Sequence, residues 1–228
     1  AAVGCCTQIL IFCLSFCLAY GQFQSCSDFV VQYGSPAVVD ISGSYAIVGY
    51  PNDTESTGKV VIFEFNQTST SASPVWSPMF FAYGNAKGDQ FGASVAIHES
   101  GIAFIGSPSA LEGRGIVYQY QYSNILWSRV NLWKGAEVDS KLGFSLATTS
   151  DKAVFSAVGT KRVFVVAASE ISGPISPPVW NIIDIIESQA SEFGFSVSIS
   201  NSGDIIGIGS PAVSTGGTGT AYLYFYDK

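Results

Sequence analysis

The chain has 228 residues, a length that suits one large all-β domain or two small ones and leaves room for a buried core. Hydrophobic residues make up 47% of it and charged residues 12%, against about 25% charged residues in an average soluble domain, and this balance excludes a disordered chain. The 10 basic and 17 acidic residues give a net charge of −7, which repels phosphate backbones and argues against a nucleic-acid partner.

The N-terminal segment differs in composition from the rest of the chain. No charged residue precedes Asp28, and residues 9–19 form an apolar run of signal-peptide length, shorter than the roughly 20 residues that span a bilayer. Ala19 and Gly21 are small residues suited to a cleavage site after Gly21. We interpret residues 1–21 as a signal peptide, with an uncleaved membrane anchor over residues 1–20 as the alternative. The absence of an initial Met fits a sequence that begins inside a longer reading frame.

The cysteines and the glycosylation triplets bear on the cellular location. All five cysteines lie near the N-terminus: Cys5, Cys6, Cys13, Cys17 and Cys26. The domain that follows therefore has no internal disulfide, and Cys26 is either an inert thiol or the site of a disulfide to another chain. Two Asn-x-Ser/Thr triplets make Asn52 and Asn66 candidates for glycosylation. These features predict a secreted, extracellular or lumenal protein, with membrane anchoring as the alternative.

An internal repeat of 51 residues organises the rest of the chain. Its clearest copies are residues 91–95, 142–146 and 193–197, which read Phe-Gly-Ala-Ser-Val, Leu-Gly-Phe-Ser-Leu and Phe-Gly-Phe-Ser-Val. The second residue of each copy is a glycine: Gly92, Gly143 and Gly194. The first is a large apolar residue that we expect to lie between adjacent repeat units: Phe91, Leu142 and Phe193. A fixed period of this kind is typical of an array of similar structural units.

Each repeat contains the pattern of four short strands. A tryptophan precedes each copy at a similar distance, and two apolar runs, a Gly-Ser-Pro or related turn and a long alternating run follow it. In the second repeat the pattern predicts strands over residues 94–97, 102–105, 115–122 and 126–132. Four strands in about 40 to 50 residues are typical of a β-propeller blade, so the sequence predicts an all-β propeller of four-stranded blades.

Tyrosines alternate along two of the predicted strands. One face of the first strand carries Tyr118, Tyr120 and Tyr122, and one face of the second carries Tyr222, Tyr224 and Tyr226. A row of aromatic rings can bind carbohydrate, but both faces of a middle strand in a propeller pack against neighbouring blades. We therefore expect these rings to lie in the core.

These motifs resemble those of a known family. The Phe-Gly-x-Ser-Val step, the Gly-Ser-Pro turns at 106–108 and 209–211, and the Gly-x-Val-Tyr-x-Tyr run at 115–120 are similar to the FG-GAP repeats of the integrin α-subunit β-propeller, especially its calcium-free variant. The resemblance covers residues 34–228. It implies a propeller with an extracellular or lumenal location and a binding role in adhesion or recognition, and it does not identify a ligand.

The resemblance also directs attention to the loops between the first two strands of each blade. Calcium-binding FG-GAP repeats carry an Asp-rich loop there, because Ca²⁺ takes roughly six to eight oxygen ligands. The corresponding loops of this chain, residues 98–101, 150–152 and 201–204, are short and poor in acidic residues. We expect tight turns at these places, and the sequence predicts no metal and no other cofactor.

No catalytic motif stands out in the sequence. His98 is the only histidine, and it falls in a predicted turn. The serine of the Phe-Gly-x-Ser step recurs once per repeat, which indicates a structural role. The glycine-rich residues 216–219 precede a strand and lack the lysine of a phosphate-binding loop. We therefore predict that the protein is not an enzyme.

Charged residues gather in loops that we expect at one end of the blades. The loops that join successive blades and those that follow the Gly-Ser-Pro turns emerge at the same rim of a propeller. The candidates for a binding surface are Asp53, Glu55, Asp89, Glu112, Arg114, Asp139 and Glu192. The expected partner is a protein or a glycan that binds without chemistry. The alternatives are a merely solvated rim and a secretory-pathway hydrolase or lyase that uses two of these carboxylates.

The number of blades stays open at this level. Residues 34–228 accommodate four blades, the last of which ends after its third strand. Residues 28–33, within the lead-in segment 22–33, form a strand-like run that would complete the fourth blade of a closed ring. The alternative is part of a longer propeller, because an open edge strand needs a partner.

Overall fold

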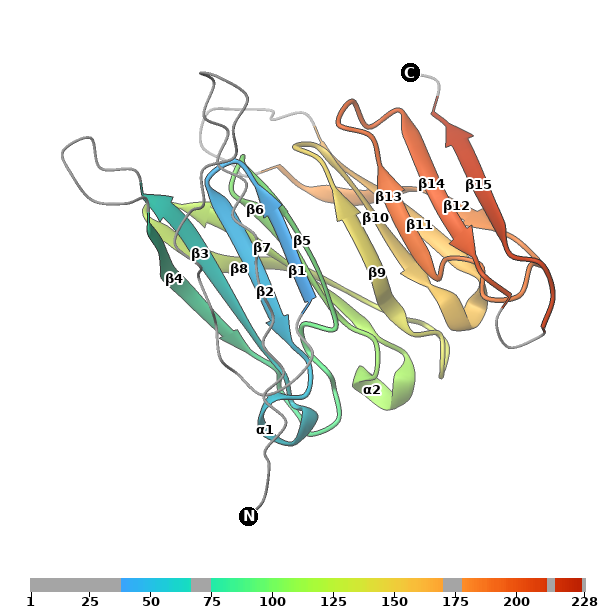
Figure 1. Cartoon of the computed structure of the whole chain (residues 1–228), viewed down its shortest axis with the longest axis horizontal. Coiled ribbons are helices and arrows are strands. Elements are labelled where there is room, and N and C mark those ends of the chain that lie inside the picture. The colour runs from blue at the N-terminus through green and yellow to red at the C-terminus, as the bar shows by residue number, and fades with distance from the viewer. Residues whose placement is uncertain (1–37, 67–74, 170–177, 213–215, 227–228) are drawn as a thin grey trace, which may run out of the picture.

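Nearly all of the described chain is β-structure. The computed structural model describes residues 38–66, 75–169, 178–212 and 216–226. These residues form 15 strands, two four-residue helices, α1 (Asp53–Ser56) and α2 (Ala110–Gly113), and the 3₁₀ turn η1 (Val158–Thr160) (Figure 1). None of the helices in these ranges is long and apolar enough to cross a membrane. The signal or anchor segment 1–21, the lead-in segment 22–33 and Cys26 lie outside the described residues.

The strands form four antiparallel sheets, and each sheet follows the chain order from one strand to the next. Sheet 1 consists of β1 (Val38–Ser42), β2 (Tyr45–Tyr50), β3 (Lys59–Asn66) and β4 (Val75–Tyr83). Sheet 2 consists of β5 (Ser94–His98), β6 (Ile102–Ser107), β7 (Ile116–Ser123) and β8 (Leu126–Lys134). Sheet 3 consists of β9 (Leu142–Thr148), β10 (Lys152–Ala157), β11 (Arg162–Ala168) and β12 (Trp180–Glu187). Sheet 4 consists of β13 (Ser196–Ile199), β14 (Ile205–Ser210) and β15 (Thr220–Phe225).

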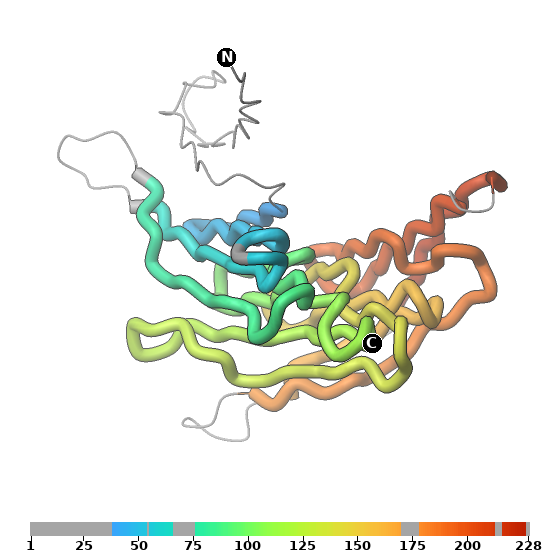
Figure 2. The backbone as a smooth tube through the Cα atoms, turned by 90° about the horizontal axis from the view of Figure 1, so that it is seen from below, coloured from blue at the N-terminus to red at the C-terminus, as the bar shows by residue number. Residues whose placement is uncertain are grey.

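This architecture confirms the predicted all-β fold of blade-like sheets. In the second repeat all four predicted strands are present, and their ends agree within two residues. The sheets stack in chain order, because β5 lies against β1 and β2, β9 lies against β5 and β6, and β13 lies against β9 and β10. Figure 2 shows the stack as an open fan with sheets 1 and 4 at its two ends. The strand-like run 28–33, which would complete the fourth blade in one of the two alternatives, lies outside the described residues.

A bulge recurs at one position in three of the sheets. The pairing of the third strand with the fourth shifts register after Ile62 in sheet 1, after Gln119 in sheet 2 and after Val165 in sheet 3. These three residues also pair with corresponding residues of the second strand, so they occupy the same place in each blade. A bulge bends a strand and increases its twist, which turns each outermost strand away from a flat sheet.

We call the contact between two successive sheets a seam. The apolar residue of each Phe-Gly step lies in a seam: Phe91, Leu142 and Phe193 are 1%, 5% and 0% exposed. Phe91 forms a parallel bridge with Gly58 of sheet 1, and Leu142 forms one with Gly115 of sheet 2. The prediction that these side chains lie between adjacent repeat units is therefore confirmed.

Glycines let the sheets approach closely at the seams. Gly92, Gly143 and Gly194 all have a φ of +85°, which glycine adopts without steric cost. A Cβ atom at Gly49 would lie 2.1 Å from the Gly92 carbonyl oxygen, and one at Gly106 would lie 2.2 Å from that of Gly143. The glycine of the Gly-x-Pro turn is therefore required by the backbone of the next sheet.

The serine of the Gly-Ser-Pro turn fixes the loop that leads into its own sheet. Ser107 Oγ donates a hydrogen bond of 2.7 Å to the Asp89 carbonyl, and Ser210 Oγ donates one to the Ser191 carbonyl. In the third repeat Ala157 occupies the place of this serine and cannot donate. The turn η1 follows Ala157 there, so the third repeat departs from the others in structure as it does in sequence.

Each seam also has a polar contact from one inner strand to the next. Asp40 Oδ2 accepts a hydrogen bond of 2.8 Å from the Ile97 amide. Ser94 Oγ donates one of 2.6 Å to the Gly143 carbonyl, and Ser145 Oγ accepts one of 3.1 Å from the Val197 amide. The repeated serine of Phe-Gly-x-Ser therefore joins sheets, in line with its predicted structural role.

The tyrosine rows contribute to the core. Tyr118 and Tyr120 are 2% and 8% exposed and pack with sheet 1 residues in one apolar cluster. Tyr222 and Tyr224 are half-buried against sheet 3. Core packing is therefore confirmed for Tyr118 and Tyr120, whereas Tyr222 and Tyr224 are only partly covered.

Candidate functional site at the rim

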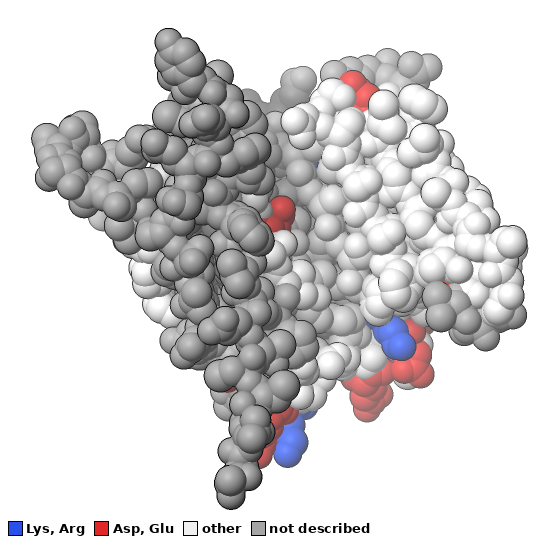
Figure 3. Space-filling view, in the orientation of Figure 1, with Lys and Arg blue, Asp and Glu red and all other residues white. Residues whose placement is uncertain are grey.

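One end of the sheets carries the loops in which a binding surface was predicted. The connections β2–β3, β6–β7 and β10–β11 and those between successive sheets all lie at this end, which we call the rim, and α1 and α2 mark it in Figure 1. Most of the charged atoms visible in Figure 3 lie along this lower edge, and the surface above it is largely uncharged.

At sheet 1, the rim acids form local contacts. Asp53 pairs with Lys59 at 2.8 Å, and Lys59 is nearly buried. Glu55 pairs with Lys87 at 3.1 Å, and both side chains are 71% exposed. Asp89 accepts a hydrogen bond from the Ala86 amide and so closes a turn. Asp53 and Asp89 therefore stabilise loops, whereas Glu55 remains accessible to a partner.

At sheet 2, Arg114 acts as a support for the rim. Its Nη1 donates to the Ala136 carbonyl, while its own carbonyl accepts hydrogen bonds from Ser140 Oγ (2.7 Å) and the Leu142 amide (3.1 Å). A Cβ atom at Gly135 would lie 1.9 Å from the Arg114 carbonyl oxygen, so the two loops are in close contact. Arg114 thus joins the β6–β7 connection to the loop that enters sheet 3.

The remaining predicted residues lie on separate loops. Glu112 and Asp139 are exposed and have φ of +59° each, and Glu192, half-buried, has the same φ. The structure thus distributes the seven predicted residues along the rim. The ion pairs of Asp53 and Glu55 each join an acid to a lysine, Lys59 and Lys87 respectively.

A pocket of about 260 Å³ lies at the rim between sheets 2 and 3. Its wall comes from the end of β8, the loop after it, and strands β9 to β12. The lining residues that matter below are Trp133, Glu137, Phe155, Arg162, Phe164 and Ile182. None of them is among the seven predicted rim residues.

Aromatic rings form one side of this pocket. The Trp133 and Phe155 ring centroids are 5.0 Å apart, and Phe104 lies behind them at 5.5 Å from Phe155. Phe104 and Phe155 are buried, and Trp133 and Phe164 are half-buried. The pocket can therefore receive an apolar group or the apolar face of a sugar ring.

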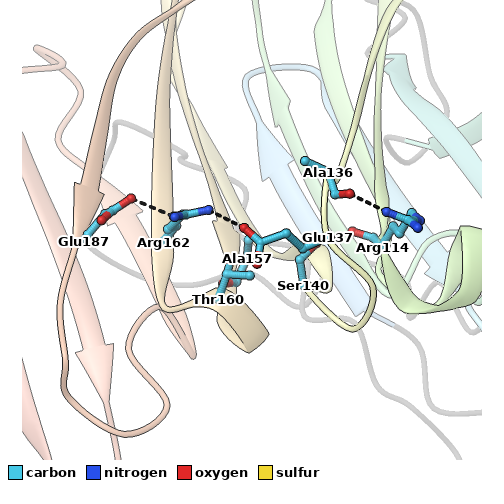
Figure 4. A network of polar contacts seen from close by, with 8 residues as sticks. All are labelled: Arg114, Ala136, Glu137, Ser140, Ala157, Thr160, Arg162 and Glu187. Carbon is cyan, nitrogen blue, oxygen red and sulfur yellow. Dashed lines mark hydrogen bonds and ion pairs between the residues drawn. The ribbon is translucent and has the colours of Figure 1, made fainter.

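A hydrogen-bonded cation, Arg162, lines the pocket. Arg162 Nε is 2.6 Å from a Glu187 oxygen, and its Nη1 is 2.7 Å from a Glu137 oxygen. Figure 4 shows the guanidinium between the two carboxylates, with Glu187 on the same sheet and Glu137 on the loop from sheet 2. These hydrogen bonds, the one to Glu187 first, raise the pKa of Arg162 above its ordinary value, so the guanidinium stays charged.

The hydroxyl groups around the pocket already have acceptors. Ser140 Oγ donates to the Arg114 carbonyl, and Thr160 Oγ1 donates to the Ala157 carbonyl at 3.2 Å. His98 lies in the β5–β6 hairpin, at the other end of sheet 2 from the rim, with its Nδ1 2.9 Å from Ser100 Oγ. The pocket residues therefore suit binding better than nucleophilic chemistry.

The short loops compared with calcium sites form compact turns. In the second repeat Ser100 caps the hairpin through His98, and in the third repeat Asp151 accepts a hydrogen bond of 3.1 Å from Thr149 Oγ1. Across residues 38–66, 75–169, 178–212 and 216–226, no three His, Cys, Asp or Glu side chains come together as metal ligands.

The sequence contained a signal for Arg162 that the repeat analysis did not use. At the start of the third strand the other repeats have Gly58-Lys59, Gly115-Ile116 and Gly219-Thr220, whereas the third repeat has Lys161-Arg162. The charged pair replaces a glycine step that the other repeats share, which indicates a local role for these side chains in the third repeat. Trp133 had no such signal, because its neighbours Phe155 and Phe104 come from other strands.

The chain was compared with known proteins. No model of a protein family matches it, and no curated protein matches it. The similarity to FG-GAP repeats therefore rests on the motifs of the sequence itself.

Proposed function

We propose that this protein is a secreted or cell-surface recognition module that binds a protein or glycan ligand at its rim without chemistry. The pocket between sheets 2 and 3 is the anchoring point. The observation that carries the proposal is that aromatic rings and the hydrogen-bonded Arg162 guanidinium line the same pocket. A buried aromatic anchor beside an arginine is the usual composition of a binding hot spot.

The size of the pocket supports the same function. Pockets for drug-sized ligands measure about 300–1,000 Å³, and this one, at about 260 Å³, is smaller. It suits one apolar side chain or one sugar unit of a larger ligand. The exposed rim residues Glu55 and Glu112 lie on neighbouring loops and are available for further contacts with such a ligand.

The arrangement of the carboxylates favours binding over hydrolysis. A glycosidase needs one carboxyl group that protonates the leaving oxygen and a second that acts as base or nucleophile. Glu137 and Glu187 are the acids beside the pocket, and both are hydrogen-bonded to the same guanidinium. The alternative of a hydrolase or lyase has no observation in its favour at this site.

The secretory location rests on the sequence. The apolar run 9–19 and the triplets at Asn52 and Asn66 support it. Asn52 is exposed, at the second position after the end of β2. An experiment on expressing cells distinguishes the two forms. A secreted chain is found in the medium, whereas an anchored chain stays on the cells and is removed by protease added outside them.

A matched pair of variants tests the pocket. Ile182 lines the pocket and is 46% exposed, whereas Ile183 is 42% exposed on the same strand and does not line it. The tagged chain is first screened on a glycan array and a displayed peptide library, and the selected ligand is then titrated with Ile182→Arg and Ile183→Arg. We expect at least about tenfold weaker binding for Ile182→Arg, or about 1.4 kcal/mol, and wild-type binding for Ile183→Arg.

Two outcomes would contradict the proposal. Equal binding by both variants would remove the pocket from the site, and turnover of the selected ligand during the assay would replace recognition by catalysis. Circular dichroism of both variants confirms that the arginine has not disturbed the fold.

A further inference from the structure

The pocket lies where the other two seams are filled by a pair of aromatic rings. In the seam between sheets 1 and 2, the Phe91 and Tyr118 ring centroids are 5.3 Å apart and the rings meet edge to face. In the seam between sheets 3 and 4, Phe193 and Tyr222 make the same edge-to-face contact, also at 5.3 Å. The first residue of the Phe-Gly step and a tyrosine of the third strand thus form a ring pair in both of these seams.

In the seam between sheets 2 and 3 both members of this pair are replaced. Leu142 is the first residue of the step here. Phe164 takes the place of Tyr118 and Tyr222, because strand pairing sets all three opposite the same position of the second strand. Both Leu142 and Phe164 line the pocket. Leucine has no ring and Phe164 has no hydroxyl group, so the space that a phenylalanine ring fills in the other seams is left open.

The walls around this space carry the opposite exchange. Trp133 stands where sheets 1 and 3 have Ala82 and Ile186, since all three lie opposite the same position of the third strand. Phe155 stands where sheet 2 has Ile105, at the residue that pairs with the ring position of the third strand. The seam between sheets 2 and 3 has therefore lost the ring pair at this place and gained rings around it.

The polar groups of the pocket favour a ring that needs few hydrogen bonds. The Ser140 and Thr160 hydroxyls donate to backbone carbonyls, and Glu137 accepts a hydrogen bond from Arg162. A sugar unit brings several hydroxyl groups, and each of them loses free energy when it is buried without a partner. A phenyl ring needs no partner, and aromatic rings attract one another at centroid distances of about 4.5–7 Å, the range of the ring pairs in the other seams.

We propose that the pocket binds a phenylalanine or tyrosine side chain of a partner protein, which takes the place that Phe91 and Phe193 fill in the other seams. This inference rests on the proposed function, because it names the class of ligand that the same pocket recognises. Aromatic side chains are frequent anchors of protein interfaces, and anchors on one partner tend to meet aromatic residues and arginine on the other. Trp133, Phe155 and Arg162 supply that combination here.

The indole N–H resonances of the full chain, labelled with ¹⁵N-tryptophan, report the binding of small probes. Trp133 lines the pocket and serves as the reporter, and Trp127, buried in the seam between sheets 1 and 2, serves as the internal control. The probes are the N-acetyl amides of phenylalanine and leucine, and methyl glucoside. We expect the phenylalanine amide to shift the Trp133 resonance saturably, and to bind roughly two- to tenfold more tightly than the leucine amide, the ratio that one aromatic pair gives.

Variants that fill the pocket locate the bound probe. Leu142→Phe gives the third repeat the phenylalanine of the other repeats, so its ring occupies the space that the probe needs. We expect Leu142→Phe to lose the Trp133 shift, whereas Ile183→Phe, on β12 but outside the pocket, retains it. Ile182→Arg blocks the pocket from an exposed position and should also lose the shift, so the test does not depend on the folding of Leu142→Phe. Circular dichroism checks the fold of each variant.

The outcomes separate this inference from the proposed function. A Trp133 shift with methyl glucoside and none with the phenylalanine amide would overturn the aromatic ligand and leave recognition of a glycan in the pocket. Equal binding of the two amides, or equal shifts in the wild type and in folded Leu142→Phe, would also overturn it. If no probe shifts Trp133, the inference fails, and the proposed function survives only if Ile182→Arg weakens binding of the ligand selected by screening.

Discussion

The Asp40 carboxylate reaches across the first seam and accepts a hydrogen bond of 2.8 Å from the Ile97 amide. Its other oxygen accepts one of 2.9 Å from the Ile41 amide. Burial raises the pKa of Asp40 above its ordinary value of 3.8, and the two hydrogen bonds oppose this shift without cancelling it.

The raised pKa of Asp40 predicts the sign of a pH effect. A carboxyl group with a higher pKa in the folded state binds its proton more tightly there, so its contribution to stability falls as the pH rises through that pKa. Asp40→Asn removes this titration. We expect the wild type to lose stability relative to Asp40→Asn as the pH rises above the ordinary pKa of 3.8, and the difference to become constant once Asp40 is ionised in the folded state. Urea unfolding across this range measures it, and a difference that grows the other way would mean that the hydrogen bonds outweigh burial.

The glycine at the second seam gives a steric prediction. In Gly106→Ala the new methyl group would meet the Gly143 carbonyl oxygen at 2.2 Å, so sheets 2 and 3 must move apart. We expect a loss of about 1–3 kcal/mol in the free energy of unfolding. Gly209→Ala is the matched control: its methyl group would meet Ser196 Oγ at 2.3 Å, as that of Gly106→Ala would meet Ser94 Oγ at 2.1 Å, but it meets no carbonyl of another sheet, so it should cost less than Gly106→Ala. Both variants are compared with the wild type by urea unfolding.

The Phe-Gly step gives a packing prediction. Phe91 is 1% exposed, and its ring centroid lies 5.3 Å from that of Tyr118. Phe91→Ala should lower the free energy of unfolding by about 3–5 kcal/mol, because it removes buried surface and leaves a cavity in the seam. Phe81→Ala, at a ring that is 50% exposed, should cost about 1 kcal/mol or less. A neutral Phe91→Ala in denaturant unfolding would refute the assigned role of the step.

A buried amide gives a prediction of the opposite sign. Gln119 is 1% exposed, and neither atom of its side-chain amide has a hydrogen-bond partner among the described residues. An unsatisfied buried polar group costs about 1–3 kcal/mol. Gln119→Leu should therefore raise the free energy of unfolding by about 1–2 kcal/mol, since Ile62 and Val165 already fill this position in other sheets. Gln121→Leu, on the same face of β7 but only half-buried, serves as the control. An unchanged or lower melting temperature for Gln119→Leu would imply a bound water that satisfies the amide.

The fold was predictable wherever the repeat is regular. The strands of the second repeat follow from alternation and from turns, which are local signals, and the burial of Phe91 and Phe193 follows from their recurrence. The role of Asp40 could not be predicted from the repeat, because its counterpart in the second repeat is Ala96. The hydrogen bond from one inner strand to the next is made by a different side chain in each of these sheets.

The pocket was not predictable in the same way. Trp133 and Phe155 are 22 positions apart in different sheets, and Arg162 meets Glu137 only because the loop from sheet 2 bends over sheet 3. The repeat predicts that neighbouring blades touch, but a pocket forms where they fail to fill the space between them. That depends on side-chain volumes in the one repeat that departs from the pattern.

The bulge that recurs after Ile62, Gln119 and Val165 has a consequence for how these molecules avoid aggregation. Strands β4, β8 and β12 are the outermost strands of their sheets, and each has a free edge that could template a strand from another molecule. A residue inserted at mid-strand interrupts the regular row of amide and carbonyl groups and turns it out of line. Edge-to-edge fibre growth would then require straightening these three strands, so the bulges protect the open edges against pairing with strands of other molecules.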